Sequence, residues 1–155
     1  MSDVLETETS SGSEFVTFII GEQEYCIDIM SLREIRGWTP ATALPDSPDY
    51  VKGVINLRGS VLPIIDLAKR LDLTSAEPSE RSVVMITQIG DQIMGLLADA
   101  VSDILTIDPT TIQPTPEMSK DNGVSFVKGL VAIENRMISV IALEVVCEPT
   151  LKEAA

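Results

Sequence analysis

The chain has 155 residues, of which 45% are hydrophobic and 4% aromatic, and its formal net charge is −13 from 24 acids and 11 bases. A protein surface that binds phosphate groups needs clustered lysine and arginine side chains. The negative net charge therefore argues against binding to nucleic acid or to an anionic membrane. The chain contains no histidine, which excludes histidine bases, histidine triads and histidine metal ligands. Cys26 and Cys147 lie far apart between apolar neighbours, and we expect two small buried hydrophobes rather than a disulfide.

Residues 1–14 carry acids, no base and several serines and threonines, which predicts a disordered acidic tail. They lack the basic start and apolar segment of a secretory signal. No apolar stretch reaches the roughly 18 residues of a membrane span. We therefore expect a reducing, cytoplasmic setting without direct membrane insertion.

Four β-hairpins are predicted in chain order, because aliphatic runs alternate with short polar turns. The predicted turns are GEQE (21–24), RG (58–59), GD (90–91) and ENR (134–136). Helical turns are expected at MSLREI (30–35) and LAKRL (67–71). Irregular connections are expected at the proline-containing loops 39–49 and 108–123 and at the polar linker 72–81.

The chain contains an internal repeat. YVKGVINLRGSVLPIIDL (50–67) aligns without a gap on FVKGLVAIENRMISVIAL (126–143), and IGEQEYCIDIMSLREI (20–35) aligns on IGDQIMGLLADAVSDI (89–104). We infer two similar halves, about 15–71 and 82–147. Each half has roughly five short strands, which close most easily into a small barrel, so we expect an all-β fold with short helices.

Arg58 interrupts an almost unbroken apolar run at the predicted turn between two strands. The second half of the repeat has Glu134 at this position, so the fold does not require a cation there. One interpretation is a solvated arginine at a hairpin turn. The other interpretation is a cation that faces a partner. The planar guanidinium forms bidentate pairs with carboxylates, and arginine is enriched at interface hot spots.

Four segments together resemble the CheW-like chemotaxis coupling proteins. They are EFVTFIIGEQEYCIDIMSLREIRG (14–37), YVKGVINLRGSVLPIIDL (50–67), GLLADAVSDIL (95–105) and FVKGL (126–130). The resemblance covers about residues 14–147. It implies two SH3-like five-stranded barrels packed side by side, without catalysis or a cofactor. It also implies an adaptor between the cytoplasmic tips of chemoreceptors and the histidine kinase CheA, whose regulatory domain has the same fold and pairs with it barrel against barrel.

The resemblance also implies residues that bind the receptor or the kinase. Glu34 and Arg58 are the charged pair, and the apolar groove between the barrels falls on Leu32, Gly53, Val83, Val101 and Ile104. The repeat relates Leu32 to Val101, as expected for a groove at a pseudo-two-fold axis, and an apolar groove suits the apolar face of a helical partner. For each apolar position, the alternative is ordinary core packing.

One departure concerns the C-terminal end. Many relatives have a polar residue where this chain has Ala142, and a proline follows early, so we expect a short last helix and a tail at 148–155.

The same residues bear on three other functions. A small hydrolase using paired carboxylates would draw on Asp66, Asp99 and Asp103, but nothing pairs them with a nucleophile. A CheW-like scaffold of a non-flagellar array, controlling twitching motility or second-messenger synthesis, would differ in partners and not in chemistry. A single-strand nucleic-acid binder is disfavoured by the charge and by the scarcity of aromatic platforms.

Overall fold

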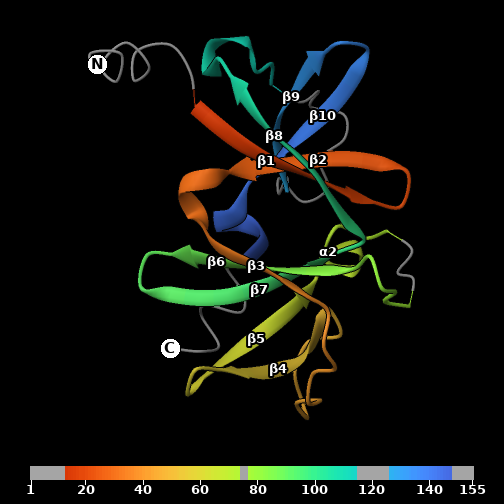
Figure 1. Ribbon diagram of the computed structural model, residues 1–155, viewed down its shortest axis with the longest axis vertical. Coiled ribbons are helices and arrows are strands. Elements are labelled where there is room, and N and C mark those ends of the chain that lie inside the picture. The colour runs from red at the N-terminus through yellow and green to blue at the C-terminus, as the bar shows by residue number, and fades with distance from the viewer. Residues whose placement is uncertain (1–12, 74–76, 115–125, 148–155) are drawn as a thin grey trace.

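The computed structural model describes residues 13–73, 77–114 and 126–147, which form two five-stranded sheets stacked in two layers (Figure 1). The first sheet has the order β8 (Ala100–Ile107), β1 (Ser13–Ile20), β2 (Gln23–Asp28), β10 (Arg136–Ile141) and β9 (Val127–Ile133). The second has the order β3 (Leu32–Gly37), β6 (Val83–Ile89), β7 (Gln92–Ala98), β5 (Ser60–Asp66) and β4 (Val51–Leu57). We call the first sheet barrel A and the second barrel B.

Each sheet curls into a barrel. The segment that follows one edge strand forms backbone hydrogen bonds with the opposite edge strand and so joins the two edges. In barrel A, Gln113 lies beyond β8 and exchanges two backbone hydrogen bonds of 2.8 Å with Leu130 of β9. In barrel B, Thr42 lies beyond β3 and exchanges two of 2.9 Å with Val54 of β4. These bridges close the edges, which is how a small sheet avoids unpaired backbone groups. The expected fold of two SH3-like barrels is confirmed.

The internal repeat is confirmed by strand register. The β4–β5 hairpin closes its turn with the pair Leu57 and Ser60, and the β9–β10 hairpin does so with Ile133 and Arg136, 76 positions later in each case. Further from the turn, each hairpin has a register irregularity at the same place. The two barrels also have the same strand order when each strand is replaced by its repeat counterpart.

The predicted division into barrels of about 15–71 and 82–147 does not match the strand pairing. The chain begins in barrel A with β1 and β2, crosses to barrel B for β3 to β7, and returns to barrel A for β8 to β10. Barrel B is therefore continuous from 32 to 98, whereas barrel A combines 13–28 with 100–141. A repeat reveals which strands have the same shape. A strand from either half of the repeat can satisfy another strand's backbone hydrogen bonds, so the repeat does not reveal which strands pair.

All four predicted hairpins form, but the expected helical turn at 30–35 is mostly wrong. Only a 3₁₀ turn, η1 (Ile29–Ser31), precedes β3 there. The second expected turn is the helix α2 (Leu67–Arg70), and the short last helix expected near the C-terminal end is a helical segment at 143–147. The structure adds a 3₁₀ turn, η2 (Pro109–Thr111). The tails predicted at 1–14 and 148–155 lie outside the described residues except for 13 and 14, as do 74–76 of the linker and 115–123 of the second loop.

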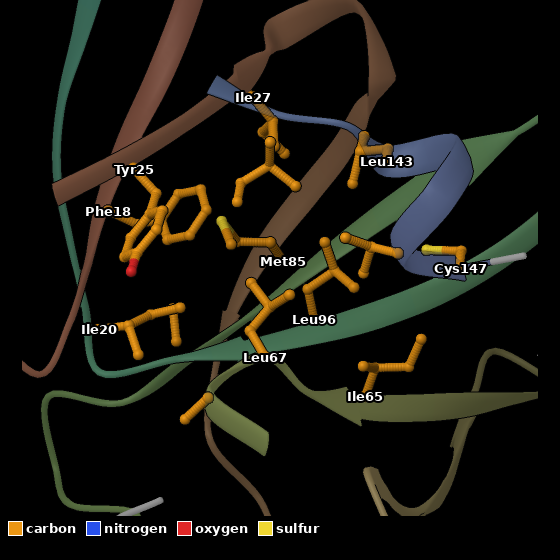
Figure 2. Packing of buried hydrophobic residues seen from close by; sticks show 14 of the residues in the cluster. Phe18, Ile20, Tyr25, Ile27, Ile65, Leu67, Met85, Leu96, Leu143 and Cys147 are labelled. Carbon is orange, nitrogen blue, oxygen red and sulfur yellow. The ribbon is translucent and has the colours of Figure 1, made fainter. Parts of the chain in front are cut away.

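The largest apolar cluster lies between the barrels and takes side chains from both (Figure 2). Phe18 and Ile27 come from barrel A, Met85 and Leu96 come from barrel B, and the helical segment at 143–147 packs against both groups. Two smaller clusters fill the barrel interiors. The two barrels are therefore joined by a shared core.

The two cysteines are buried free thiols, as the sequence predicts. Cys26 lies in the interior cluster of barrel A, and Cys147 lies in the shared core. Burial raises the pKa of each thiol to about 12, so neither thiol is activated as a nucleophile.

A single arginine joins the barrels around the last helical segment. The guanidinium carbon of Arg70 lies 4.6 Å from the ring centroid of Tyr50 and 4.5 Å from that of Phe126, which the repeat relates to each other. Its Nε donates to the carbonyl of Val146 at 2.8 Å, and its Nη2 donates to that of Val145 at 3.3 Å. Arg70 thus satisfies carbonyls near the C-terminal end of that segment, where cations are favourable.

Candidate functional site

The turn that carries Arg58 is the two-residue connection between β4 and β5. Arg58 has φ of 51° and Gly59 has φ of 90°, so both central residues are left-handed, as in the turns that suit tight hairpins. The Asn56 side chain accepts a hydrogen bond of 2.9 Å from the Gly59 amide and fixes the turn. The side chain of Arg58 is 69% exposed at this turn.

Glu34 on β3 is held by two arginines. Its Oε1 lies 2.8 Å from Nη2 of Arg58, and its Oε2 lies 3.1 Å from Nη1 of Arg36. The hydrogen bond from Arg58, and then that from Arg36, lowers the pKa of the Glu34 carboxyl below its usual range. The predicted contact between Arg58 and Glu34 is confirmed. Exposed pairs of this kind contribute little to folding, so their charges remain available to a partner.

A pocket of about 380 Å³ opens beside this pair at the end of barrel B. Arg33, Glu34 and Arg58 supply its charged residues. Its apolar lining includes Leu62 and Ile86, which belong to the interior cluster of the barrel. We call this the barrel B pocket. It combines an apolar lining with a charged rim, as protein-binding sites commonly do.

The other predicted site residues are not among those that line the barrel B pocket. Leu32, Val83 and Val101 are half-buried and pack against the shared core, so their placement is compatible with the predicted groove between the barrels. Ile104 is 56% exposed on β8. Gly53 is buried in β4, where the chain of Thr42 crosses it. Which of these residues contact a partner stays a prediction.

Ile104 belongs to one of two repeat-related pairs of exposed apolar residues, and the other three members were not predicted from the sequence. Ile35 of β3 is 41% exposed, and Ile104 is its repeat counterpart. Val61 of β5 and Met137 of β10, also counterparts, are 65% and 62% exposed. The alignment of the repeat contains this signal, because it pairs an apolar residue with an apolar residue at both positions.

The aspartates considered for carboxylate catalysis have separate structural roles. Asp66 accepts a hydrogen bond from the Lys69 amide at the start of α2, and Asp99 accepts one of 2.8 Å from the Gly21 amide. Asp103 pairs with Arg136. Within the described ranges, no three His, Cys, Asp or Glu side chains lie together so as to hold a metal ion. Among the helices of the same ranges, none has the length and apolar character to cross a membrane.

Comparison with known proteins adds a family to this geometry. A model of the CheW-like domain matches residues 14–148. The chain is 53% identical over 155 residues to a probable chemotaxis protein CheW of Rhizobium etli and 49% identical over 155 residues to the chemotaxis protein CheW of Rhizobium meliloti, and each alignment covers 100% of both chains. The crystal structure of the scaffolding protein TtCheW from Thermoanaerobacter tengcongensis matches with a TM-score of 0.82 at 33% identity, over 88% of this chain and 93% of that one.

Proposed function

The chain belongs to the family of CheW-like domains, and we propose that it is a non-catalytic chemotaxis adaptor that couples chemoreceptors to the histidine kinase CheA. An adaptor needs at least two partner-facing surfaces on one rigid body. The observation that carries the proposal is the repeated exposure of apolar side chains, at Ile35 and Val61 on barrel B and at Ile104 and Met137 on barrel A. Each barrel therefore exposes two apolar side chains, and each of them has an exposed apolar counterpart on the other barrel.

The kinase partner would be the regulatory domain of CheA. The family resemblance implies that this domain has the same double-barrel fold and pairs with the adaptor barrel against barrel. Such pairing would cover the exposed apolar side chains of one barrel, and burying apolar area is the main favourable term in protein association.

The receptor partner would be the helical tip of a chemoreceptor. The half-buried side chains of Leu32, Val83 and Val101 next to the shared core would form the apolar groove, and Glu34 with Arg58 would set the orientation of the bound helix. The protein would then work in the cytoplasm and be recruited to membrane-associated receptor arrays through these contacts.

The test is a binding measurement followed by reconstitution. The purified protein is titrated with the regulatory domain of its cognate CheA kinase, and kinase activity is then measured with and without receptors. We expect association below about 100 μM, near the weak end for specific contacts, and receptor-dependent activation that requires the protein. If neither association nor activation is detected, the proposed adaptor function is wrong.

A further inference from the structure

The two barrel ends that the repeat relates differ in their side chains. In barrel A, the guanidinium of Arg136 bonds to both carboxylate oxygens of Glu24 and lies 3.1 Å from Oδ2 of Asp103. The hydroxyl of Thr17 accepts a hydrogen bond of 2.9 Å from the Asp103 amide. We call Glu24, Asp103 and Arg136 the barrel A ion cluster. The side chains of Arg136 and Glu24 are only 26% and 18% exposed, so charged groups occupy this end.

The pocket residues of barrel B are the counterparts of that cluster. Ser60 stands at the position of Arg136, and Ile93 stands at the position of Glu24. Ile86 likewise replaces Thr17. A short side chain and two aliphatic ones thus replace a large ion pair and a hydroxyl on the same backbone, and the barrel B pocket lies where the cluster would be.

The rim of the barrel B pocket has the opposite charge to most of the chain. Arg33 and Arg58 line the pocket, and Arg36 lies beside them. Arg36 and Arg58 both pair with Glu34, and neither has another acid partner within the described residues. Arg33 donates a hydrogen bond to the amide oxygen of Gln88, which leaves its charge unpaired there. Three arginines around one glutamate form a cationic rim on a chain whose net charge is −13.

We propose that the barrel B pocket is a docking site for an acidic segment of a partner protein that inserts one aliphatic side chain. The aliphatic group would lie against Leu62, Ile86 and Ile93, and acidic groups beside it would pair with the arginines of the rim. The pocket volume of about 380 Å³ suits a single side chain with part of its backbone. An apolar anchor surrounded by complementary charge is the usual pattern of a binding hot spot.

This inference rests on the proposed adaptor function and gives it a direction. The counterpart end of barrel A is occupied by its own ion cluster, and it has Ser102 and Glu134 where barrel B has Arg33 and Arg58. An acidic segment would find neither an apolar space nor a cationic rim there. The two ends of the molecule therefore cannot exchange partners, even though their backbones are equivalent.

The repeat supplies matched variants for the test. The first, Ser60→Arg with Ile93→Glu, transfers the ion cluster into the barrel B pocket. The second, Ser60→Phe, obstructs the pocket without adding a charge. The control, Glu24→Ile with Arg136→Ser, makes the reverse exchange in barrel A. Melting curves establish whether each variant folds. If Ser60→Arg with Ile93→Glu does not fold, Ser60→Phe tests whether the pocket binds the partner segment.

The probe is a pentapeptide with a central leucine between pairs of glutamates, titrated into ¹⁵N-labelled full-length protein. We expect shifts of the Ser60 and Ile93 amide signals with a Kd of about 1 mM, in the range of single weak contacts. Replacing the leucine by serine, or the glutamates by lysines, should weaken binding about tenfold or more. Both pocket variants should lose binding, and the barrel A control should retain it. Equal binding of the lysine peptide, or unchanged binding by a folded pocket variant, would overturn the proposal.

The same variants separate this proposal from the adaptor function. In the reconstituted receptor–kinase assay, we expect both pocket variants to lose coupling. A folded pocket variant that couples as well as the wild type would show that the pocket is not a partner site, and the adaptor function would stand. A wild-type protein that fails to couple would overturn the adaptor function, while the peptide titration would still decide the chemistry of the pocket.

Discussion

Gly53 lies so close to Thr42 that a Cβ atom at the glycine would be 2.4 Å from the Thr42 carbonyl oxygen. The repeat reproduces this contact at Gly129, where a Cβ atom would be 2.5 Å from Cγ2 of Ile112 and 2.9 Å from the Gln113 carbonyl oxygen. In both barrels, this is the place where the crossing chain closes the sheet edge. The shared sequence VKG therefore reflects barrel closure, since only glycine lets the two backbones approach so closely.

Replacing Gly53 or Gly129 by alanine should destabilise the protein. Backbone atoms would have to move in either barrel, and overpacking of this kind costs about 1–3 kcal/mol. Gly37→Ala is the control, because a Cβ atom there meets nothing within 4 Å, and its effect should stay within about 0.5 kcal/mol. Urea denaturation measures all three. If Gly53→Ala unfolds at the same urea concentration as Gly37→Ala, barrel closure does not depend on the glycine.

The hairpins could be predicted from the sequence because their signals are local. Alternating aliphatic residues around a short turn are visible within about 15 residues. Strand β3 could not be predicted in this way, because its sequence LREIRG contains three charges and most of its residues are exposed. It is a strand because it pairs with β6, about 50 residues away. The exchange of strands between the two repeats depends on such distant pairing throughout.

The two barrel ends that the repeat relates could be predicted from the sequence to different degrees. The pair of Glu34 with Arg58 followed from the family resemblance and the position of the turn. Arg136 gave no such signal, since its partner Glu24 lies 112 positions away and is brought to it only by the strand exchange. The barrel B pocket was also hidden, because it depends on the small size of Ser60 next to residues from other strands.

The barrel A ion cluster predicts a specific loss of stability in acid. Bonding from Arg136 lowers the pKa of Glu24 in the folded state, so this bond stabilises the fold above the unfolded pKa of about 4.3 and is lost as the pH falls through the lower folded value. Glu24→Gln should therefore reduce the free energy of unfolding at pH 7 by about 1 kcal/mol. The difference from wild type should disappear well below pH 4.

Thermal melts of both proteins between pH 2 and pH 7 check this expectation. Glu22→Gln, at an exposed position in the preceding turn, is the control and should melt like the wild type over the whole range. A stability difference for Glu24→Gln that persists unchanged in acid would mean that the charge of Glu24 is not the cause.

Arg70 is expected to hold the barrels and the last helical segment together. Arg70→Met keeps much of the apolar stem but removes both hydrogen bonds to the carbonyls and the two cation–π contacts. We expect a loss of about 2–3 kcal/mol, since charge-assisted hydrogen bonds contribute about 1.5–3 kcal/mol each and half-buried cation–π contacts add to them. Arg70→Lys keeps the charge without the planar guanidinium, and its stability should lie between that of the wild type and that of Arg70→Met. Equal stability of the methionine and lysine variants would show that the charge of Arg70 does not matter.

Arg58 is the residue for which folding and binding should separate most clearly. Its side chain is 69% exposed, and the counterpart Glu134 occupies the same left-handed turn position without harm to the second hairpin. Arg58→Glu should therefore leave the melting temperature nearly unchanged. In the reconstituted assay, it should abolish receptor-dependent kinase activation, because it places a second carboxylate against Glu34 and reverses the charge that a partner would meet.

Arg81→Glu makes the same change of charge at another exposed arginine, outside the pocket, and should both melt and couple like the wild type. Melting curves and the receptor–kinase assay on the two variants together decide the role of Arg58. An Arg58→Glu protein that unfolds would make the arginine a structural residue. If it instead melts and couples normally, Arg58 is only a solvated side chain at a turn. Loss of coupling in the Arg81 variant as well would attribute the effect to net charge and not to the pair with Glu34.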